Sequence, residues 1–314
     1  MKNVLITGGM GFIGSHLARS LVQSGDNVTI LSRSDRKRRN IEDIASSVNV
    51  LVKDIREIKP EDVHGMDQIY HLAGTVDNYA VENKQPFRDI ETNCLGTQCL
   101  LEACRLAESK ARLLFGSTFF VYGNLSKLPA TPESHTNPLS LYGATRLCAE
   151  KLTQIYGKAY NLNPVVARFA NVFGPFDDAN KQKGAFNWMI GLAVNGEPLN
   201  VYNGGEFVRD YIYVGDVVDA CKLLAEKGEK LKIYDVGRGP VKFADLIGMI
   251  VKQIPGVKIN FMDPPKHHKN VGITDFYTSS LDLRGLGWEP KVSLEEGIVR
   301  TIDYYKVLQQ SKNI

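Results

Sequence analysis

The chain has 314 residues, enough for one large α/β domain or for a nucleotide-binding domain with a smaller second lobe. A hydrophobic content of 43% and a charged content of 23% are ordinary for a soluble globular protein. The net charge of +3 is too small to imply nucleic acid or a membrane surface as a partner. The sequence has no charged-then-apolar leader and no apolar run near the roughly 20 residues of a membrane span. Five cysteines without a Cys-x-x-Cys pair predict buried thiols in a reducing cytosol, so we expect a cytoplasmic protein without a metal site.

The most informative segment is the glycine-rich stretch at residues 4–14. A short apolar run predicts a buried strand, closely spaced glycines follow it, and apolar residues then recur at helical spacing. Strand, glycine turn and helix form the context in which such glycines bind a dinucleotide. The glycines permit the tight turn, the approach of a pyrophosphate and close helix packing, and the first helical turn offers N–H groups to the phosphates. The predicted contacts of the dinucleotide here are Gly8, Gly11, Phe12, Ile13 and Gly14.

The first half of the chain alternates short apolar runs with amphipathic stretches, which is typical of a doubly wound parallel sheet. We predict strands at 3–7, 27–31, 48–52, 68–72, 112–117 and 164–168. We predict helices at 12–24, about 40–45, 87–108 and 140–160. Beyond about residue 170, loops rich in Gly, Pro and Asn separate shorter elements. This change predicts a dinucleotide-binding domain over 1–169 and a smaller substrate-binding lobe over 170–314, with strands near 199–202 and 232–236 as candidates to rejoin the first sheet.

Further motifs follow predicted strands or open a predicted helix, and together with the glycine turn they identify a family. These motifs are Ile69 to Gly74, Arg112 to Gly123, Tyr142 to Arg146, Val166 to Pro175, Gly205 to Ala220 and Leu286 to Pro290. In this order they resemble the extended short-chain dehydrogenase/reductase family, in the branch that acts on nucleotide sugars. The resemblance covers nearly the whole chain. It implies an α/β fold in which a doubly wound parallel (Rossmann) sheet carries a smaller C-terminal substrate-binding lobe.

The resemblance also implies a catalytic pair. Tyr142 matches the tyrosine that gives or takes a proton at a sugar hydroxyl or ketone, and Thr118 matches the Ser/Thr that hydrogen-bonds the reacting oxygen. A free phenol has a pKa near ~10, so work near neutrality requires a drop of roughly 3 units. A nearby cation and an oxidised nicotinamide are expected to supply it. The alternatives are a tyrosine at the edge of the core and a threonine at a strand end.

The sequence departs from the family four residues after this tyrosine, where Arg146 replaces the usual lysine. Arginine keeps the positive charge and can donate to ribose hydroxyls, but its planar guanidinium is larger and fixed in geometry. Two accounts are open: a working variant, or a site that binds the cofactor with weak or absent turnover. We favour the working variant because Tyr142 and Thr118 are both retained.

Two phenylalanines reduce the number of reactions that the site could catalyse. The 4,6-dehydratases of this family carry an Asp-Glu pair directly after the Ser/Thr, and the related decarboxylases keep the glutamate. Here the two places hold Phe119 and Phe120, which offer neither an acid nor a base. The sequence therefore argues against dehydration and decarboxylation.

The end of the second predicted strand bears on the cofactor. Family members that use NAD place an acidic residue there to bind the ribose hydroxyls. This chain has Ser32 and Arg33, with further basic residues over 36–39, and a guanidinium suits a 2′-phosphate. The alternative is a basic, solvated loop. We expect NADP(H) in preference to NAD(H).

The expected preference for NADP(H) favours a reductase over an epimerase. A net reductase consumes NADPH, so we expect a nucleotide-sugar 4-ketoreductase that takes the hydride from the nicotinamide and the proton from Tyr142. The alternative is a nucleotide-sugar 4-epimerase with a retained NAD. A second alternative is a non-catalytic NADP-binding module, supported only by Arg146.

The resemblance assigns the remaining contacts residue by residue. Asp54 and Ile55 match the pair at the adenine, and Leu72, Ala73 and Gly74 match the loop beside the pyrophosphate. The residues expected to contact a nucleoside diphosphate sugar are Thr75, Thr118, Asn171 and Arg209. A salt bridge with Asp210 is the alternative for Arg209, and residues 266–269 match the family poorly. Relatives commonly dimerise through helices that match 93–108 and 140–160, so a homodimer is expected.

Overall fold

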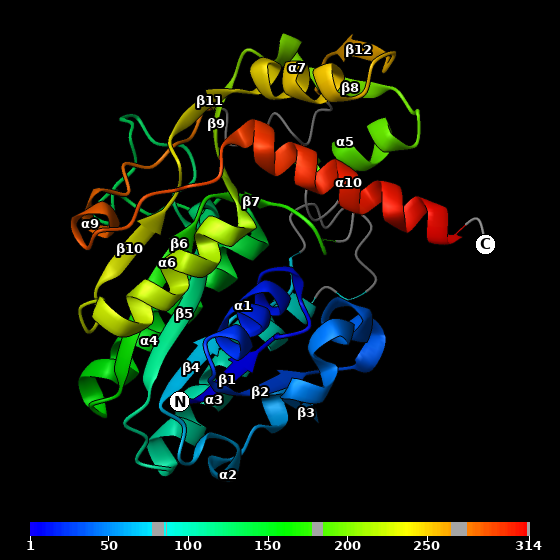
Figure 1. Cartoon of the computed structure of the whole chain (residues 1–314). Helices are drawn as coiled ribbons and strands as arrows, with labels where there is room; N and C mark the ends of the chain where they lie inside the picture. The colour runs from blue at the N-terminus through cyan, green and yellow to red at the C-terminus, as the bar shows by residue number, and fades with distance from the viewer. Residues whose placement is uncertain (77–84, 86, 178–184, 265–274, 313–314) are drawn as a thin grey trace.

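The computed structural model describes residues 1–76, 85, 87–177, 185–264 and 275–312. Residues 266–269, which match the family poorly, lie outside this described part. Figure 1 shows a twisted sheet with helices on both faces, and above it a group of short strands and helices from the second half of the chain. The fold is α/β and Rossmann-like, as the sequence predicts.

Seven parallel strands form the central sheet, in the order β10-β6-β5-β4-β1-β2-β3. They are β1 (Asn3–Thr7), β2 (Asn27–Ser32), β3 (Val48–Val52), β4 (Gln68–His71), β5 (Arg112–Thr118), β6 (Asn163–Phe169) and β10 (Ile233–Val236). The inner strands are buried over most of their length, which is why each was recognisable as a short apolar run. The chain runs outward from β1 to β3 in one direction and from β4 to β10 in the other. Such a reversal opens a crevice at the carboxyl ends of the strands, where ligands of this fold class bind.

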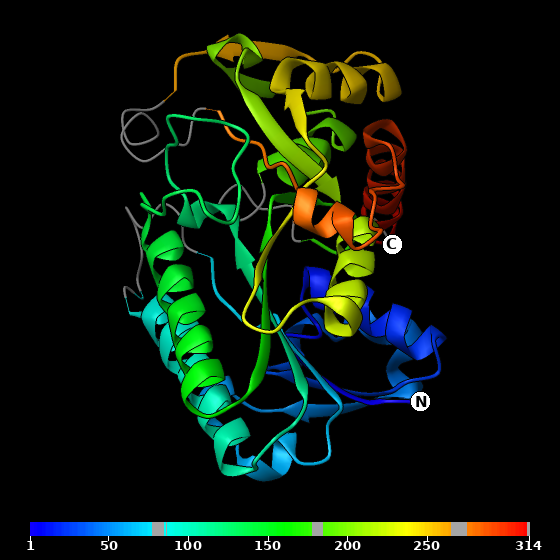
Figure 2. The same ribbon diagram turned by 90° about the vertical axis from the view of Figure 1, so that its left-hand side faces the viewer.

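Helices cover the two faces of this sheet (Figures 1 and 2). One face carries α1 (Phe12–Gln23) and α6 (Val214–Lys227), whose Leu17 and Val217 join one buried apolar cluster. The other carries α3 (Gly96–Leu106) and α4 (Leu141–Ala159), whose Leu100 and Ala149 join a second. Figure 2 shows α3 and α4 side by side along the outside of the molecule.

Two predicted helices differ from the observed elements. The segment predicted as one helix over 87–108 contains a π-helix, η4 (Ile90–Leu95), which continues directly into α3. The helix predicted near 40–45 is part of a longer 3-10 helical segment, η1 (Asp35–Ser47). Hydrophobic spacing detects a buried helical face, but it does not distinguish these hydrogen-bonding patterns. The described residues also form the short elements η2 (Ile55–Glu57), α2 (Pro60–Val63), η5 (Phe119–Val121), η6 (Asn203–Gly205) and α9 (Leu281–Gly285).

The second half of the chain contributes two small sheets and further helices. The strands β7 (Asn171–Phe173), β9 (Val208–Tyr213) and β11 (Pro240–Lys242) form one sheet, while β8 (Leu199–Tyr202) and β12 (Ile259–Met262) form the other. The helices are α5 (Ala185–Val194), α7 (Phe243–Gln253) and α10 (Leu294–Lys312), and they share a third apolar cluster. Of the two candidate strands, β10 joins the central sheet and β8 pairs with β12 instead. The division at residues 169 and 170 stays a prediction.

The cysteines correct one expectation. Cys104 and Cys221 are buried, and Cys94 and Cys99 are half-buried, but Cys148 is exposed. The prediction of five buried thiols is wrong for Cys148 because this residue lies on the outer face of α4, away from the sheet. Among the helices of the described residues, none combines the length and the apolar character needed to cross a membrane.

Candidate functional site

The glycine turn brings β1, α1 and the end of β4 into close contact. Gly8 has a φ of +74°, and a Cβ built on it would lie 2.8 Å from the backbone nitrogen of Ala73. A Cβ on Gly14 would overlap the carbonyl oxygen of Gly8, so only glycine fits at both positions. Gly11 caps α1 in an extended conformation without a capping side chain, and the first turn contains no acidic residue. This helix N-terminus fits an anionic group such as a pyrophosphate.

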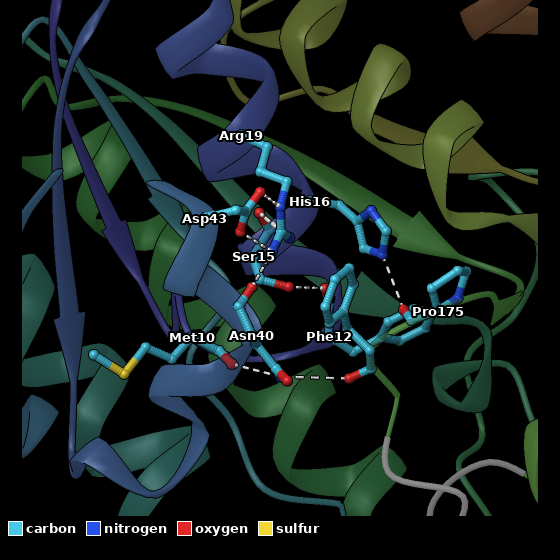
Figure 3. Close-up of polar contacts among 9 residues, drawn as sticks. Met10, Phe12, Ser15, His16, Arg19, Asn40, Asp43 and Pro175 are labelled. Atoms are coloured by element: carbon cyan, nitrogen blue, oxygen red, sulfur yellow. Dashed lines mark hydrogen bonds and ion pairs between the residues drawn. The ribbon is translucent and has the colours of Figure 1, made fainter. Parts of the chain in front are cut away.

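Figure 3 shows the polar contacts that hold this turn from the other side. Asn40 of η1 donates to the carbonyl of Met10 (3.1 Å), and Arg19 forms a two-pronged ion pair with Asp43 (2.6 and 2.7 Å).

His16 donates from Nε2 to the carbonyl of Pro175 (2.9 Å), which connects α1 to the second half of the chain. Burial lowers the pKa of His16 to about 4, so the ring is neutral at pH 7. The turn is therefore fixed by contacts from η1 and from the segment after β7. Phe12 and Ile13 are half-buried against the third apolar cluster.

A buried hydrogen-bond chain fixes the residues after β4. Ala73 N–H donates to Thr7 Oγ1 (3.2 Å), which contacts His71 Nδ1 (2.7 Å). Thr97 Oγ1 donates to the carbonyl of Asn93 (2.6 Å) and lies 2.9 Å from His71 Nε2. Because the hydrogen of Thr97 is used in this way, Nε2 of His71 donates to Thr97 and Nδ1 accepts from Thr7. Burial, with a smaller effect from Arg146, lowers the pKa of His71 to about 3, which keeps this ring neutral. The next residue, Leu72, donates its N–H to the carbonyl of Thr7 (3.1 Å).

Tyr142 and Thr118 meet at the carboxyl end of the sheet. Thr118 ends β5, and Tyr142 lies in the first turn of α4, where Ser140 caps the helix by accepting from Gly143 N–H (3.1 Å). The Thr118 side chain lies near enough to the phenol of Tyr142 to act on its pKa. Burial nevertheless raises the pKa of Tyr142 above its ordinary value, although Arg146 and Thr118 act in the opposite direction. The expected drop in pKa is therefore absent from the chain alone, because burial outweighs the nearby cation.

Arg146 connects this pair to the loop after β4. Its side chain is almost fully buried, its Cζ lies 4.6 Å from the centre of the Phe115 ring, and Nη1 donates to the carbonyl of Ala73 (3.4 Å). A Cβ on Gly74 would lie 2.9 Å from Nη1, so the guanidinium and the loop are in direct contact. Burial lowers the pKa of Arg146, and the phenol of Tyr142 opposes this effect more strongly than the other nearby groups do. No group in the described part of the chain accepts a hydrogen bond from Nε of Arg146. That buried donor fits a bound group rich in oxygen acceptors, such as a ribose.

The two phenylalanines after Thr118 form an aromatic wall. Phe119 is buried against Phe276, with 4.6 Å between ring centroids. Phe120 packs edge-on against Tyr142, with 5.8 Å between centroids and 71° between ring planes. The surroundings of the phenol on this side are therefore apolar.

The adenosine end of the site contains Ser32, Arg33, Asp54 and Ile55. Ser32 Oγ donates to the carbonyl of Ser34 (3.2 Å), and Arg33 is exposed. Arg56 holds the Asp54 carboxylate with its fork and lowers the pKa of Asp54, and the charge of Arg33 adds a smaller effect. Ile55 is buried. Arg33 and Asp54 thus lie near each other at the ends of adjacent strands.

The predicted substrate residues Asn171 and Arg209 lie in the small sheet. Asn171 of β7 pairs with Tyr211 of β9, two residues beyond Arg209, and its Nδ2 donates to the carbonyl of Asp210 (2.9 Å). Arg209 places its Cζ 4.6 Å from the centre of the Phe207 ring. The strand pairing therefore brings the two residues to the same part of the small sheet.

Asp210 has a structural task of its own. Its carboxylate is completely buried and accepts the backbone N–H groups of Arg238 (2.8 Å), Gly239 (3.0 Å) and Thr278 (3.0 Å). The hydroxyl of Thr278 also donates to it (3.1 Å). This carboxylate joins three segments of the second half of the chain, which accounts for its burial without a salt bridge to Arg209.

Two buried polar residues beside Thr75, Asn93 and Asp89, belong to none of the motifs found in the sequence. Asn93 of η4 accepts from Thr75 N–H (3.0 Å) and donates to the carbonyl of Thr75 (3.1 Å) and to Thr145 Oγ1 (3.0 Å). Asp89 accepts from Thr75 Oγ1 (2.5 Å). Asp89, Asn93 and Thr97 follow one another at intervals of four residues, and all three are buried. Polar residues at this helical spacing, within a segment rich in apolar residues, are the signal that points to a buried hydrogen-bond site.

Comparison with known proteins gives the family. Residues 4–237 match the model described as the NAD dependent epimerase/dehydratase family. The chain is 29% identical over 309 residues to a putative UDP-glucose 4-epimerase from Methanocaldococcus jannaschii, with 96% of this chain and 98% of the relative covered. It is 33% identical over 321 residues to UDP-glucuronic acid decarboxylase 1 from Xenopus tropicalis, with 97% and 72% covered.

A solved structure gives the same result. The crystal structure of UDP-glucuronic acid 4-epimerase from Bacillus cereus, in complex with UDP-glucuronic acid and NAD, superposes with a TM-score of 0.87. It is 26% identical in sequence, and the match covers 98% of this chain and 99% of that one. The chain therefore belongs to the NAD dependent epimerase/dehydratase family, the extended short-chain dehydrogenase/reductases, whose nucleotide-sugar epimerases and dehydratases are oxidoreductase-type enzymes.

Proposed function

We propose that this protein is a nucleotide-sugar 4-epimerase. The observation that carries the proposal is the placement of Tyr142 beside Thr118, a buried cation and an aromatic wall. The 4-epimerases among the relatives and solved structures support it, and they favour this alternative over the 4-ketoreductase that the sequence put first.

The side chains suit proton transfer at a sugar carbon. A nicotinamide cofactor, when bound at the glycine turn, would supply the acceptor and donor of a hydride. Tyr142 takes the proton of a sugar hydroxyl on oxidation and returns it on reduction, while Thr118 hydrogen-bonds the reacting oxygen. Arg146 holds a positive charge beside the phenol, which opposes the effect of burial on the pKa of Tyr142. The charge of the oxidised cofactor would act in the same direction.

The aromatic wall argues against the other reactions of the family. Elimination of water needs an acid and a base beside the sugar, and Phe119 and Phe120 stand where dehydratases carry that pair. Phe119 is packed into the core, and Phe120 covers one edge of Tyr142. An uncharged wall of this kind shields the phenol and leaves proton transfer to Tyr142 itself.

The cofactor is of the NAD(P) class. The structural neighbour with NAD bound favours NAD, and this fits an epimerase that retains and recycles its cofactor. Ser32 and the exposed Arg33 favour a 2′-phosphate, because no acidic residue stands at the end of β2. This observation supports a second candidate function, the NADPH-dependent reduction of a 4-keto nucleotide sugar.

We propose a nucleoside diphosphate sugar as the substrate, with Arg209 and Asn171 at its phosphates. A planar guanidinium can donate two parallel hydrogen bonds to phosphate oxygens.

We also propose a homodimer through α3 and α4, the adjacent helices on one outer face (Figure 2). Their outward side carries exposed apolar residues, among them Leu106 (58% exposed) and Ile155 (56% exposed). A four-helix contact would cover these residues.

Two parallel incubations separate the two candidate functions. Purified protein is mixed with a UDP-hexose and a catalytic amount of NAD, and in parallel with a 4-keto nucleotide sugar and NADPH. An epimerase forms the 4-epimer without net change in the nicotinamide absorbance. A ketoreductase leaves the UDP-hexose unchanged and oxidises NADPH in proportion to the ketone. Tight cofactor binding with neither reaction would contradict both candidates.

A further inference from the structure

The loop after β4 places one threonine in an unusual hydrogen-bonding state. Thr75 is half-buried and follows Gly74, whose Cα faces Nη1 of Arg146. Its N–H donates to Asn93 Oδ1 (3.0 Å), and its carbonyl accepts from Asn93 Nδ2 (3.1 Å). The N–H of Thr75 is therefore occupied within the protein, and its carbonyl keeps one lone pair. Thr75 can offer a bound molecule this lone pair and its side-chain hydroxyl.

The hydroxyl is itself oriented by a carboxylate. Thr75 Oγ1 donates to Asp89 Oδ1 over 2.5 Å, and the Asp89 side chain is only 2% exposed. A threonine hydroxyl has one hydrogen and two acceptor lone pairs, and an ionised carboxylate can only accept. The charge of Asp89 also acts on Arg146, whose guanidinium lies against the same loop. The single hydrogen of Thr75 thus points to Asp89, and the remaining lone pairs can only accept.

We propose that Asp89 makes Thr75 an obligate hydrogen-bond acceptor, so that the sugar group beside Thr75 must be a donor, a hydroxyl or an amide N–H. A carboxylate or a keto oxygen at that sugar position would face the lone pairs of Thr75 without a hydrogen between them. Asp89 acts through Thr75 and is a specificity-positioning residue, not a catalytic one. The inference rests on the proposed nucleotide-sugar substrate and specifies its chemistry at one position.

The test is a binding experiment that needs no turnover. Calorimetry compares UDP, UDP-glucose and the deoxy and deoxyfluoro analogues at each sugar position, with wild-type protein and the variants Thr75→Val and Thr75→Ser. In the wild type, one sugar position loses about tenfold in affinity on removal of its hydroxyl, the size expected for one hydrogen bond. Fluorine at that position gives the same loss, because it cannot donate. Thr75→Val abolishes the difference between UDP-glucose and this analogue, and Thr75→Ser keeps it.

The variant Asp89→Leu tests the orienting carboxylate. It frees the hydrogen of Thr75 to point at the sugar, so the fluorinated analogue should bind more tightly than the deoxy analogue in this variant. In the double variant Asp89→Leu/Thr75→Val this difference disappears, because the hydroxyl is gone. A merely structural role for Asp89 would weaken all UDP-sugars equally and leave the ratios between analogues unchanged.

Two results would contradict the account, and they differ. If wild type and Thr75→Val rank the analogues identically, or if Asp89→Leu changes no ratio, the inference about Thr75 and Asp89 is wrong while the proposed function stands. If neither UDP nor any other nucleoside diphosphate, alone or with a sugar, binds the wild-type protein, the proposed function fails and the inference fails with it.

Discussion

The guanidinium of Arg146 lies over the ring of Phe115, with 4.6 Å from Cζ to the ring centroid. Arg146 belongs to α4, the helix that also carries Tyr142. This contact holds a buried cation at a fixed place between the phenol and the loop after β4. In the family that position holds a lysine, whose ammonium is a point charge on a flexible stem. The arginine keeps the charge and adds a planar face that matches the aromatic ring.

Arg146 should therefore be needed for its charge. We expect Arg146→Lys to keep turnover within about tenfold of the wild type, because the cation is retained. Arg146→Gln should lower it by about a hundredfold or more, the size seen when one electrostatic group is removed from a reaction site. The rate of sugar oxidation against pH should also shift to higher pH in Arg146→Gln, because the pKa of Tyr142 rises when the cation is lost. Equal pH profiles in wild type and Arg146→Gln would contradict this role.

Tyr142 should carry the proton transfer. Tyr142→Phe removes the acidic group but keeps the edge-on ring contact with Phe120, so the fold and cofactor binding are expected to persist. Turnover should fall by roughly a hundredfold to ten-thousandfold, the usual contribution of general acid–base catalysis. Thr118→Val should give a smaller loss, and Thr118→Ser should retain most of the activity. Fluorescence titration with the cofactor, beside the rate measurement, checks that only turnover is lost.

The cofactor preference should depend on the end of β2. If Arg33 contacts a 2′-phosphate, Arg33→Ala lowers the affinity for NADP(H) by about tenfold to a hundredfold and leaves that for NAD(H) unchanged. Ser32→Asp should shift the preference toward NAD(H), because its carboxylate repels the phosphate and accepts from the ribose hydroxyls. Dissociation constants for both cofactors measure this directly. Equal losses for NAD(H) and NADP(H) in Arg33→Ala would show that this arginine does not read the 2′-phosphate.

The outer face of α4 should carry the dimer contact. Ile155 is 56% exposed in the single chain, and Ile155→Asp would place a charge in the proposed four-helix contact. We expect this variant to be monomeric by light scattering at concentrations where the wild type is a dimer. Phe261→Asp is the matched control, since Phe261 is 69% exposed on β12, far from α4 in the sequence. A wild-type protein that is monomeric at all concentrations would refute the proposed interface.

Asp235 should make stability depend on pH. Tyr122 Oη donates to Asp235 Oδ1 (2.7 Å), but burial raises the pKa of Asp235 to about 7 from an ordinary value of 3.8. Tyr122 and Arg168 oppose this effect, whereas the charges of Glu150 and Asp210 add to it. Between these pH values the unfolded chain releases a proton that the folded chain keeps. Raising the pH from 4 to 7 therefore costs the folded state up to about 4 kcal/mol through this group.

The variant Asp235→Asn removes this titration and can still accept from Tyr122. The gain in its free energy of unfolding over that of the wild type should grow as the pH rises from 4 to 7, and then level off. Chemical denaturation at several pH values measures the difference between the two proteins, in which the contributions of His16 and His71 cancel. A difference that is constant with pH would show that Asp235 titrates normally.

Much of the fold could be predicted because parallel strands buried on both faces form continuous apolar runs. Six strands of the central sheet were located in this way from the sequence, each to within about two residues. The short strands β7, β9 and β11 could not be located so well, since they depend on partners distant in the sequence. The π-helix η4 was merged with α3 because both share one apolar face.

The residues of the candidate site that belong to family motifs could be predicted from the sequence. Those that join the site through contacts between distant parts of the chain could not. Asp89 and Asn93 find their partner Thr75 at separations of 14 and 18 residues, and Asn93 reaches Thr145 over 52. The helical spacing of these residues indicates a buried polar site, but it does not identify the distant partners. The cation beside Tyr142 is visible in the sequence, but the depth of burial that raises the pKa of Tyr142 in the chain alone is not.

The most direct test of the account follows the 4-position of a UDP-hexose by NMR, with wild-type protein, catalytic NAD(P) and the Tyr142→Phe variant as control. We expect the wild type to convert the sugar to a mixture of its two 4-epimers without net consumption of the cofactor, and Tyr142→Phe to leave the sugar unchanged. Unchanged UDP-hexose with stoichiometric oxidation of NADPH by a 4-keto sugar would contradict the proposed epimerase, and equal activity in Tyr142→Phe would contradict the proposed site.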